Sequence, residues 1–85
     1  MKLLMTHTYP NPDNLETTKT DVFTKFGEEA DLIDTALNVV EVTLKKYNPA
    51  ALTQMEQQLH VDDHASAHYQ IEGLKCYFNV QLSAS

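Results

Sequence analysis

The sequence predicts a small α+β domain with the element order β-α-α-β-β, in which a three-stranded antiparallel sheet has two helices packed on one face. Three patterns lead to this fold class. Residues 2–9 and residues 65–82 alternate apolar and polar side chains, which is the period of a strand with one buried face. Residues 23–47 carry apolar side chains at steps of three and four, which is the period of an amphipathic helix. A shorter helical pattern follows from Pro49.

The first strand is expected over residues 2–9. Its more apolar side carries alternate residues, which are Leu3, Met5, His7 and Tyr9. Pro10 and Pro12 should end the strand, because proline has no backbone N–H to donate to a neighbouring strand. The polar, threonine-rich residues 15–19 are expected to form a loop.

The longest pattern predicts one helix that begins at Thr20 or Asp21, either of which can cap it, and ends at Tyr47. Its apolar stripe consists of Phe23, Phe26, Ala30, Ile33, Leu37, Val40, Leu44 and Tyr47. Gly27 costs about 1 kcal/mol relative to alanine inside a helix. Because the stripe continues through Gly27, a single helix that is kinked or frayed there is favoured, and a separate short turn over residues 21–26 is the alternative.

Asn48 and Pro49 mark the start of the second helix. A residue before proline is pushed out of the helical region, asparagine is a good N-cap, and proline is favoured in the first helical turn. This helix should end near His60. Its apolar face carries Ala51, Leu52, Met55 and Leu59.

A C-terminal β-hairpin is expected around a two-residue turn at Glu72 and Gly73. This turn places apolar residues opposite one another on a single face, as a true hairpin register requires. The expected pairs are Ile71 with Leu74, Tyr69 with Cys76, Ala67 with Phe78, and Ala65 with Val80. The core predicted from all the elements comprises Ile33, Leu37, Val40, Leu44, Leu59, Phe78 and Val80.

The charge balance argues against direct nucleic-acid binding. Twelve acidic residues stand against six basic ones, giving a net charge of −6, and every basic residue is lysine. Nucleic-acid affinity comes mainly from clustered basic charge, and phosphate recognition favours the planar guanidinium of arginine. We therefore expect no direct contact with nucleic acid.

Length and hydropathy indicate one domain over residues 1–85, in the cytoplasm. The apolar run near the N-terminus is too short for a signal peptide, and no run approaches the ~20 apolar residues of a membrane span. No membrane association is expected. A chain this short buries only about 60% of the surface exposed when it is unfolded, and proteins of this size often add contacts by oligomerising.

Three histidines at a spacing of four suggest a metal site at first sight: His60, His64 and His68. On one continuous helix they would converge on a zinc-sized ion. The predicted boundaries instead put His60 at a helix end, His64 in a loop and His68 on the polar face of a strand. No metal is therefore expected, and a small metal-binding protein that uses these histidines is kept as an alternative.

The sequence contains no group of residues with a pattern typical of a catalytic site. Cys76 is the single cysteine, and the alternation places it on the apolar face of the hairpin, where a buried structural thiol is expected. The two glycines, Gly27 and Gly73, cannot form a glycine-rich phosphate loop. We therefore expect a protein that is not an enzyme and that has no catalytic residue, cofactor or small-molecule substrate.

The long helical pattern gives the strongest functional indication. Its apolar surface, widened by Leu32, Ala36, Val39 and Val42, exceeds what one small sheet can cover. Uncovered apolar surface on a small domain indicates a protein interface. The residues predicted to bind a partner lie at the N-terminal end of this pattern and are Phe23, Phe26, Ala30 and Leu32.

The function expected from the sequence is that of a non-enzymatic protein-interaction module, a small regulator or assembly subunit. It would dock on itself as a homodimer or on another protein. An alternative from a different class is an acidic inhibitor, of the kind made by phages or mobile elements, that mimics nucleic acid. The acidic net charge and the small size support this alternative.

Overall fold

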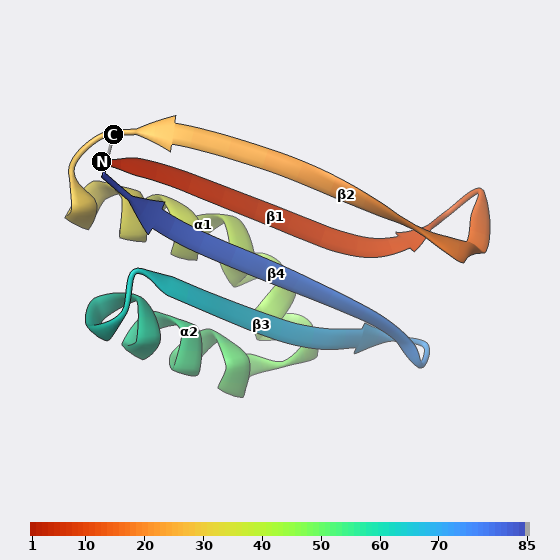
Figure 1. Cartoon of the computed structure of the whole chain (residues 1–85). Coiled ribbons are helices and arrows are strands. Elements are labelled where there is room, and N and C mark those ends of the chain that lie inside the picture. Colours follow the sequence, from red (N-terminus) through yellow and green to blue (C-terminus); the bar gives the residue numbers. More distant parts are fainter. Residues whose placement is uncertain (85) are drawn as a thin grey trace.

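The computed structural model describes residues 1–84, which form a four-stranded antiparallel sheet with both helices on one side of it (Figure 1). The strands lie in the order β2-β1-β4-β3. In chain order the elements are β1 (Lys2–Asn11), β2 (Asn14–Phe26), α1 (Glu29–Tyr47), α2 (Pro49–Val61), β3 (His64–Ile71) and β4 (Leu74–Ser83). The α+β class and the packing of two helices on one face are confirmed. The sheet has four strands rather than three, and the element order is β-β-α-α-β-β.

The additional strand, β2, replaces the predicted loop over residues 15–19 and the predicted first turns of the long helix. Residues 17–24 are rich in threonine, valine and phenylalanine, which fit a pleated surface better than a helix. Phe23 and Phe26 stand three residues apart and so imitate a helical stripe. In the strand they point to opposite faces, because side chains alternate along it.

Gly27 lies at the junction between strand and helix. Its N–H donates to the carbonyl oxygen of Met1 at 3.1 Å, which ties the end of β2 to the start of β1. Glu28 has an extended backbone and serves as the N-cap of α1 without a side-chain capping bond. The long helix therefore starts at Glu29 rather than at Thr20 or Asp21, so the prediction of one helix running through Gly27 is wrong.

Asn48 makes the sharp boundary between the helices, as predicted. Its N–H donates to the carbonyl oxygen of Leu44 at 2.8 Å, and its Oδ1 accepts a bond from the N–H of Ala51 at 3.3 Å. Its Nδ2 also donates to the carbonyl oxygen of His68 at 2.7 Å. This one side chain caps α2 and ties the helix junction to β3.

The β3–β4 hairpin has the predicted register throughout. Tyr69 pairs with Cys76 and Ala67 pairs with Phe78, so the apolar residues of both strands face the helices. Glu72 and Gly73 have φ values of 52° and 80°. Positive φ at both central residues is the geometry of a type I′ turn, the common two-residue hairpin connection.

A single core lies between the helices and the strands β1, β4 and β3. Six of the seven residues predicted for it are buried: Ile33, Val40, Leu44, Leu59, Phe78 and Val80. The seventh, Leu37, is only partly buried and packs against the edge of the core. Leu37 lines a shallow depression between the two helices, together with Leu52, and that position leaves part of its side chain in water. Within residues 1–84, no helix is both long enough and apolar enough to cross a bilayer.

Candidate interaction surface

β2 is an edge strand, and all thirteen of its residues are exposed. In Figure 1 it lies at the opposite side of the sheet from α2, and both helices pack mainly over β1, β4 and β3. Residues 18–26 pair in an unbroken register with residues 2–10 of β1. Among the described residues no strand pairs with the other side of β2. A row of backbone N–H and C=O groups along that side can therefore pair with another strand.

The helix-facing side of β2 carries Lys19, Asp21, Phe23 and Lys25. This side is identified by the register, because Phe23 pairs with the buried Met5, and Lys25 pairs with the buried Leu3. Phe23 itself is 40% exposed, since α1 does not extend over it. Beside it, a groove of about 210 Å³ runs between β2 and α1. The groove is lined by Met5, His7, Asp21, Val22, Phe23, Val39, Thr43 and Phe78.

The flank of α1 beside this groove is also apolar. Val39 lines the groove and Val42 lies one turn further along the same side of the helix, and the two are 48% and 80% exposed. Lys25 extends toward this flank, where its Nζ donates to Oγ1 of Thr35 at 3.2 Å. Apolar surface on β2 is therefore continuous with apolar surface on the adjacent helix.

The open side of the sheet continues the apolar surface around the edge. Val22 and Phe26 project there and are 64% and 65% exposed, and Leu4 on the neighbouring strand is 36% exposed. The Nζ of Lys2 lies 6.0 Å from the centre of the Phe26 ring. Both faces of β2 thus present large apolar side chains at the same free edge. We call this region the β2 edge surface, made up of residues 18–26 with Leu4, Val39 and Val42.

The four residues predicted to bind a partner fall in three different environments. Phe23 and Phe26 are exposed on β2, although the sequence pattern assigned them to a helix. Ala30 is exposed in the first turn of α1. Leu32 is fully buried in the core, so it has no surface to offer a partner. Sequence reasoning did not include Val22 and Leu4, and the threonine-rich alternation around Val22 is the signal that indicates a strand there.

Charged and titratable groups gather next to the groove. His7 stacks on Phe78, with 4.1 Å between the ring centres, and its Nε2 lies 2.6 Å from the hydroxyl oxygen of Tyr69. Burial lowers the pKa of His7, and the nearby Asp21 carboxylate opposes that shift in part. The pKa of Tyr69 is raised well above its usual range, mainly by burial and secondly by the neighbouring thiol of Cys76.

Asp21 has a second partner in this region, because it accepts a hydrogen bond from the hydroxyl of Tyr9 at 2.9 Å. That bond is the main cause of a raised pKa at Tyr9. Cys76, a candidate nucleophile by residue type, is buried with 1% of its surface exposed, as predicted. These polar side chains lie at the edge of the core, and their contacts hold His7 and Asp21 beside the groove.

The three spaced histidines do not share one helix. His60 lies near the end of α2, and His64 and His68 lie on β3. The chain turns between the end of α2 and the start of β3. Across residues 1–84, no three His, Cys, Asp or Glu side chains gather closely enough to hold a metal ion. His68 instead lies beside Tyr77 across the hairpin, with 5.6 Å between the ring centres.

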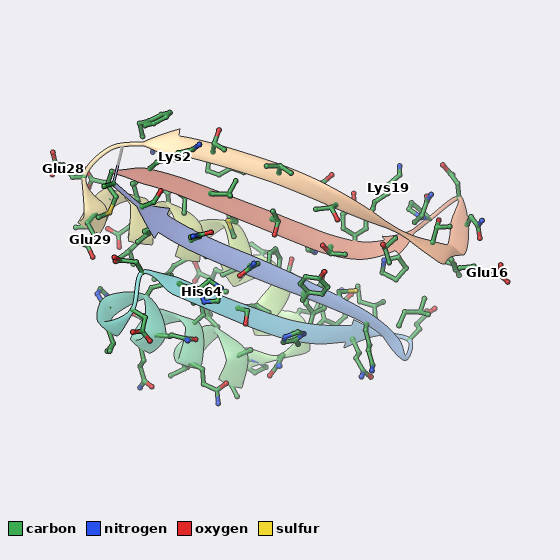
Figure 2. All side chains as sticks on the ribbon, viewed as in Figure 1. Lys2, Glu16, Lys19, Glu28, Glu29 and His64 are labelled. Carbon is green, nitrogen blue, oxygen red and sulfur yellow. The ribbon has the colours of Figure 1, made fainter. Side chains whose placement is uncertain are left out.

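The acidic residues avoid the open face of the sheet. The register assigns nineteen residues of the four strands to that face, and none of them is Asp or Glu. They are Lys2, Leu4, Thr6, Thr8, Pro10, Thr18, Thr20, Val22, Thr24, Phe26, His64, Ser66, His68, Gln70, Lys75, Tyr77, Asn79, Gln81 and Ser83. Figure 2 shows Glu28 and Glu29 at the junction of β2 with α1 instead. The broad open face is thus unsuited to imitate the phosphates of a nucleic acid.

No family model, curated protein or solved structure matches the chain. The fold and its surface define the class: an α+β domain whose N-terminal hairpin presents a long, exposed edge strand beside a shallow groove, with Val22, Phe23 and Phe26 on a strand that pairs on one side only.

Proposed function

We propose that the chain is a non-enzymatic protein-interaction module, a small regulator or assembly subunit, that docks on itself or on a protein partner through the β2 edge surface. The observation that carries this proposal is that all thirteen residues of the edge strand β2 are exposed. The known peptide-recognition mode that fits such an edge is addition of a strand, in which main-chain bonds give affinity and alternate side chains give specificity.

The composition of β2 supports docking rather than protection from it. Proteins shield free edges with short strands, proline, bulges or charged side chains, above all lysine. Residues 18–26 form a long stretch that contains no proline and pairs without a bulge. Its three charges, on Lys19, Asp21 and Lys25, are of both signs, so opposite charges on another strand can pair with them. Exposed apolar surface costs about 25 cal/mol per Å², so covering the apolar side chains of β2 stabilises a complex.

Two substitutions on the open side of β2 test this proposal. Val22→Lys and Phe26→Lys each place a charge on the β2 edge surface, and both side chains are exposed enough that the monomer fold should tolerate the change. Val61→Lys is a matched control, because Val61 is 83% exposed near the end of α2, away from β2. Sedimentation velocity measures self-association, and quantitative co-purification from cells that express the chain measures partner binding.

The proposal expects a complex, with itself or with another protein, that Val22→Lys and Phe26→Lys weaken and Val61→Lys leaves unchanged. A chain that stays monomeric and retains the same co-purifying proteins in all three variants would contradict it.

A further inference from the structure

We propose that the occupant of the β2 edge surface is a second copy of the chain, whose β2 pairs antiparallel with the first around a two-fold axis at Phe23. This inference rests on the proposed function, because it names the partner that docks at the same edge. The two sheets would join into one continuous eight-stranded sheet, built from two copies of the four-stranded sheet. A two-fold axis lets the same patch serve both sides of the interface.

The geometry of strands limits the possible registers. Directly opposed residues must lie on the same face of the joined sheet, so the two-fold axis must pass through a residue rather than between two. Opposite charges across such a pair stabilise it, and like charges destabilise it. The charged residues in the regular part of β2 are Lys19, Asp21 and Lys25, all on the helix-facing side, and they distinguish the registers.

Two registers oppose like charges. An axis at Asp21 places this carboxylate against its own copy. An axis at Val22, the midpoint of the regular stretch, places Lys19 against Lys25 of the second copy, twice. Pairing over the whole of residues 18–26 therefore always brings Lys19 of one copy against Lys25 of the other.

Two further registers use less of the strand. An axis at Thr20 opposes Lys19 to Asp21, but it pairs only residues 18–22 of the regular stretch. An axis at Thr24 pairs only residues 22–26 and opposes no charges of opposite sign.

The register centred on Phe23 combines length with complementary charge. It pairs residues 20–26 of each copy and places Asp21 opposite Lys25 of the other copy, twice, flanking a central contact between the two Phe23 rings. On the open side it places Val22 opposite Thr24 and Phe26 opposite Thr20. Each of these opposed pairs brings together an apolar side chain and a threonine methyl group.

The side chains required on the helix-facing side are already held there. Asp21 Oδ2 accepts a bond from Tyr9, which leaves its other oxygen for Lys25 of the second copy. Lys25 is exposed, and its single contact with Thr35 leaves further N–H groups to donate. Phe23 lies between them along the strand and is 40% exposed. Less ordering is therefore required on association than from a disordered edge.

Charge exchange tests both the partner and the register, and sedimentation equilibrium measures the dimer dissociation constant. In this register position 21 of each copy faces position 25 of the other. Asp21→Lys therefore creates two pairs of facing lysines, and Lys25→Asp creates two pairs of facing aspartates. We expect each to weaken the dimer about ten-fold or more. The double variant Asp21→Lys/Lys25→Asp restores the two attractive pairs and the net charge, and it should recover dimerisation.

Glu56→Lys is the matched control, because it makes the same change of charge as Asp21→Lys at an exposed site on α2. It should leave the dissociation constant unchanged. Circular dichroism and thermal unfolding of each variant establish that the monomer fold is retained.

Each remaining outcome overturns the inference in a distinct way. A wild-type chain that is monomeric at high micromolar concentration excludes self-pairing, while the proposed function survives if Val22→Lys abolishes binding of a different protein. A dimer that is unaffected by the single variants excludes the register centred on Phe23. A dimer that Asp21→Lys weakens and the double variant does not restore indicates the register centred on Thr20.

Discussion

The imidazole of His7 and the phenol of Tyr69 meet at 2.6 Å, although the two residues are sixty-two positions apart in the chain. The contact joins β1 to β3 across β4, on the helix-facing side of the sheet. A neutral imidazole can accept this bond at Nε2, and the lowered pKa of His7 favours the neutral form. The contact between β1 and β3, with Tyr69 as the donor, therefore depends on His7 being neutral.

The free energy of unfolding should decrease as the pH is lowered below 6.5. The pKa of His7 is lowered in the folded protein from its ordinary value of 6.5, so the unfolded chain takes up a proton first. The unfolded state then binds more protons, and the free energy of unfolding decreases on acidification. Urea unfolding at pH 7.5 and at pH 5.5 measures the loss. His7→Gln should reduce this pH dependence, and an unchanged pH dependence in that variant would contradict the assignment.

Core truncations should separate Phe78 from Leu37. Phe78 is 2% exposed and stacks on His7, so Phe78→Ala should cost about 3–5 kcal/mol of unfolding free energy. Leu37 is partly buried, so Leu37→Ala should cost about 1–2 kcal/mol, below the usual range for a fully buried leucine. Chemical denaturation of both variants checks the order, and equal losses would contradict the placement of Leu37.

The turn of the C-terminal hairpin offers a stabilising substitution. Glu72 has a φ of 52°, a region that asparagine tolerates better than glutamate. Glu72→Asn creates the preferred sequence for a type I′ turn and should raise the unfolding free energy by about 0.5–1 kcal/mol. The neighbouring Gly73→Ala should instead lower it, because the φ of Gly73 is 80°. Thermal unfolding measures both effects, and a destabilised Glu72→Asn would contradict this account of the turn.

Asn48, which is partly buried, should be the most sensitive polar position outside the core. Asn48→Ala removes the cap of α2 and the bond from Nδ2 to the carbonyl oxygen of His68. The expected loss is about 1–2 kcal/mol of unfolding free energy. Asn48→Asp keeps the capping oxygen and loses the amide donor, so denaturation of this second variant should show an intermediate loss. If Asn48→Ala has no effect, the helix junction is held by other contacts.

The C-terminal half of the fold follows from local signals. The alternation of residues 65–82 has a single glycine at its break, and a slip by one residue would expose Phe78, so one register satisfies the pattern. The pair Asn48 and Pro49 likewise specifies a helix start by its own backbone chemistry. Both features depend on residues close together in the chain, where periodicity is informative.

The N-terminal hairpin could not be derived in the same way. Phe23 and Phe26 fit a helical stripe that continues beyond Gly27, and an edge strand with apolar residues on both faces has no clean alternation. Pairing with β1 decides the matter, and pairing is a tertiary effect. The same error explains the mixed result for the candidate site, since Phe23 and Phe26 are exposed while Leu32 begins the buried face of α1.

The central claim is that the outer side of β2 pairs with another strand. Hydrogen exchange of the backbone amides, measured over a range of protein concentrations, tests it most directly. The amides of residues 20–26 that point away from β1 should be protected at high concentration and lose that protection on dilution. The amides of β4, which pair on both sides within one chain, should keep theirs. Outward amides of β2 that exchange freely at every concentration, and in the presence of co-purified proteins, would contradict the claim.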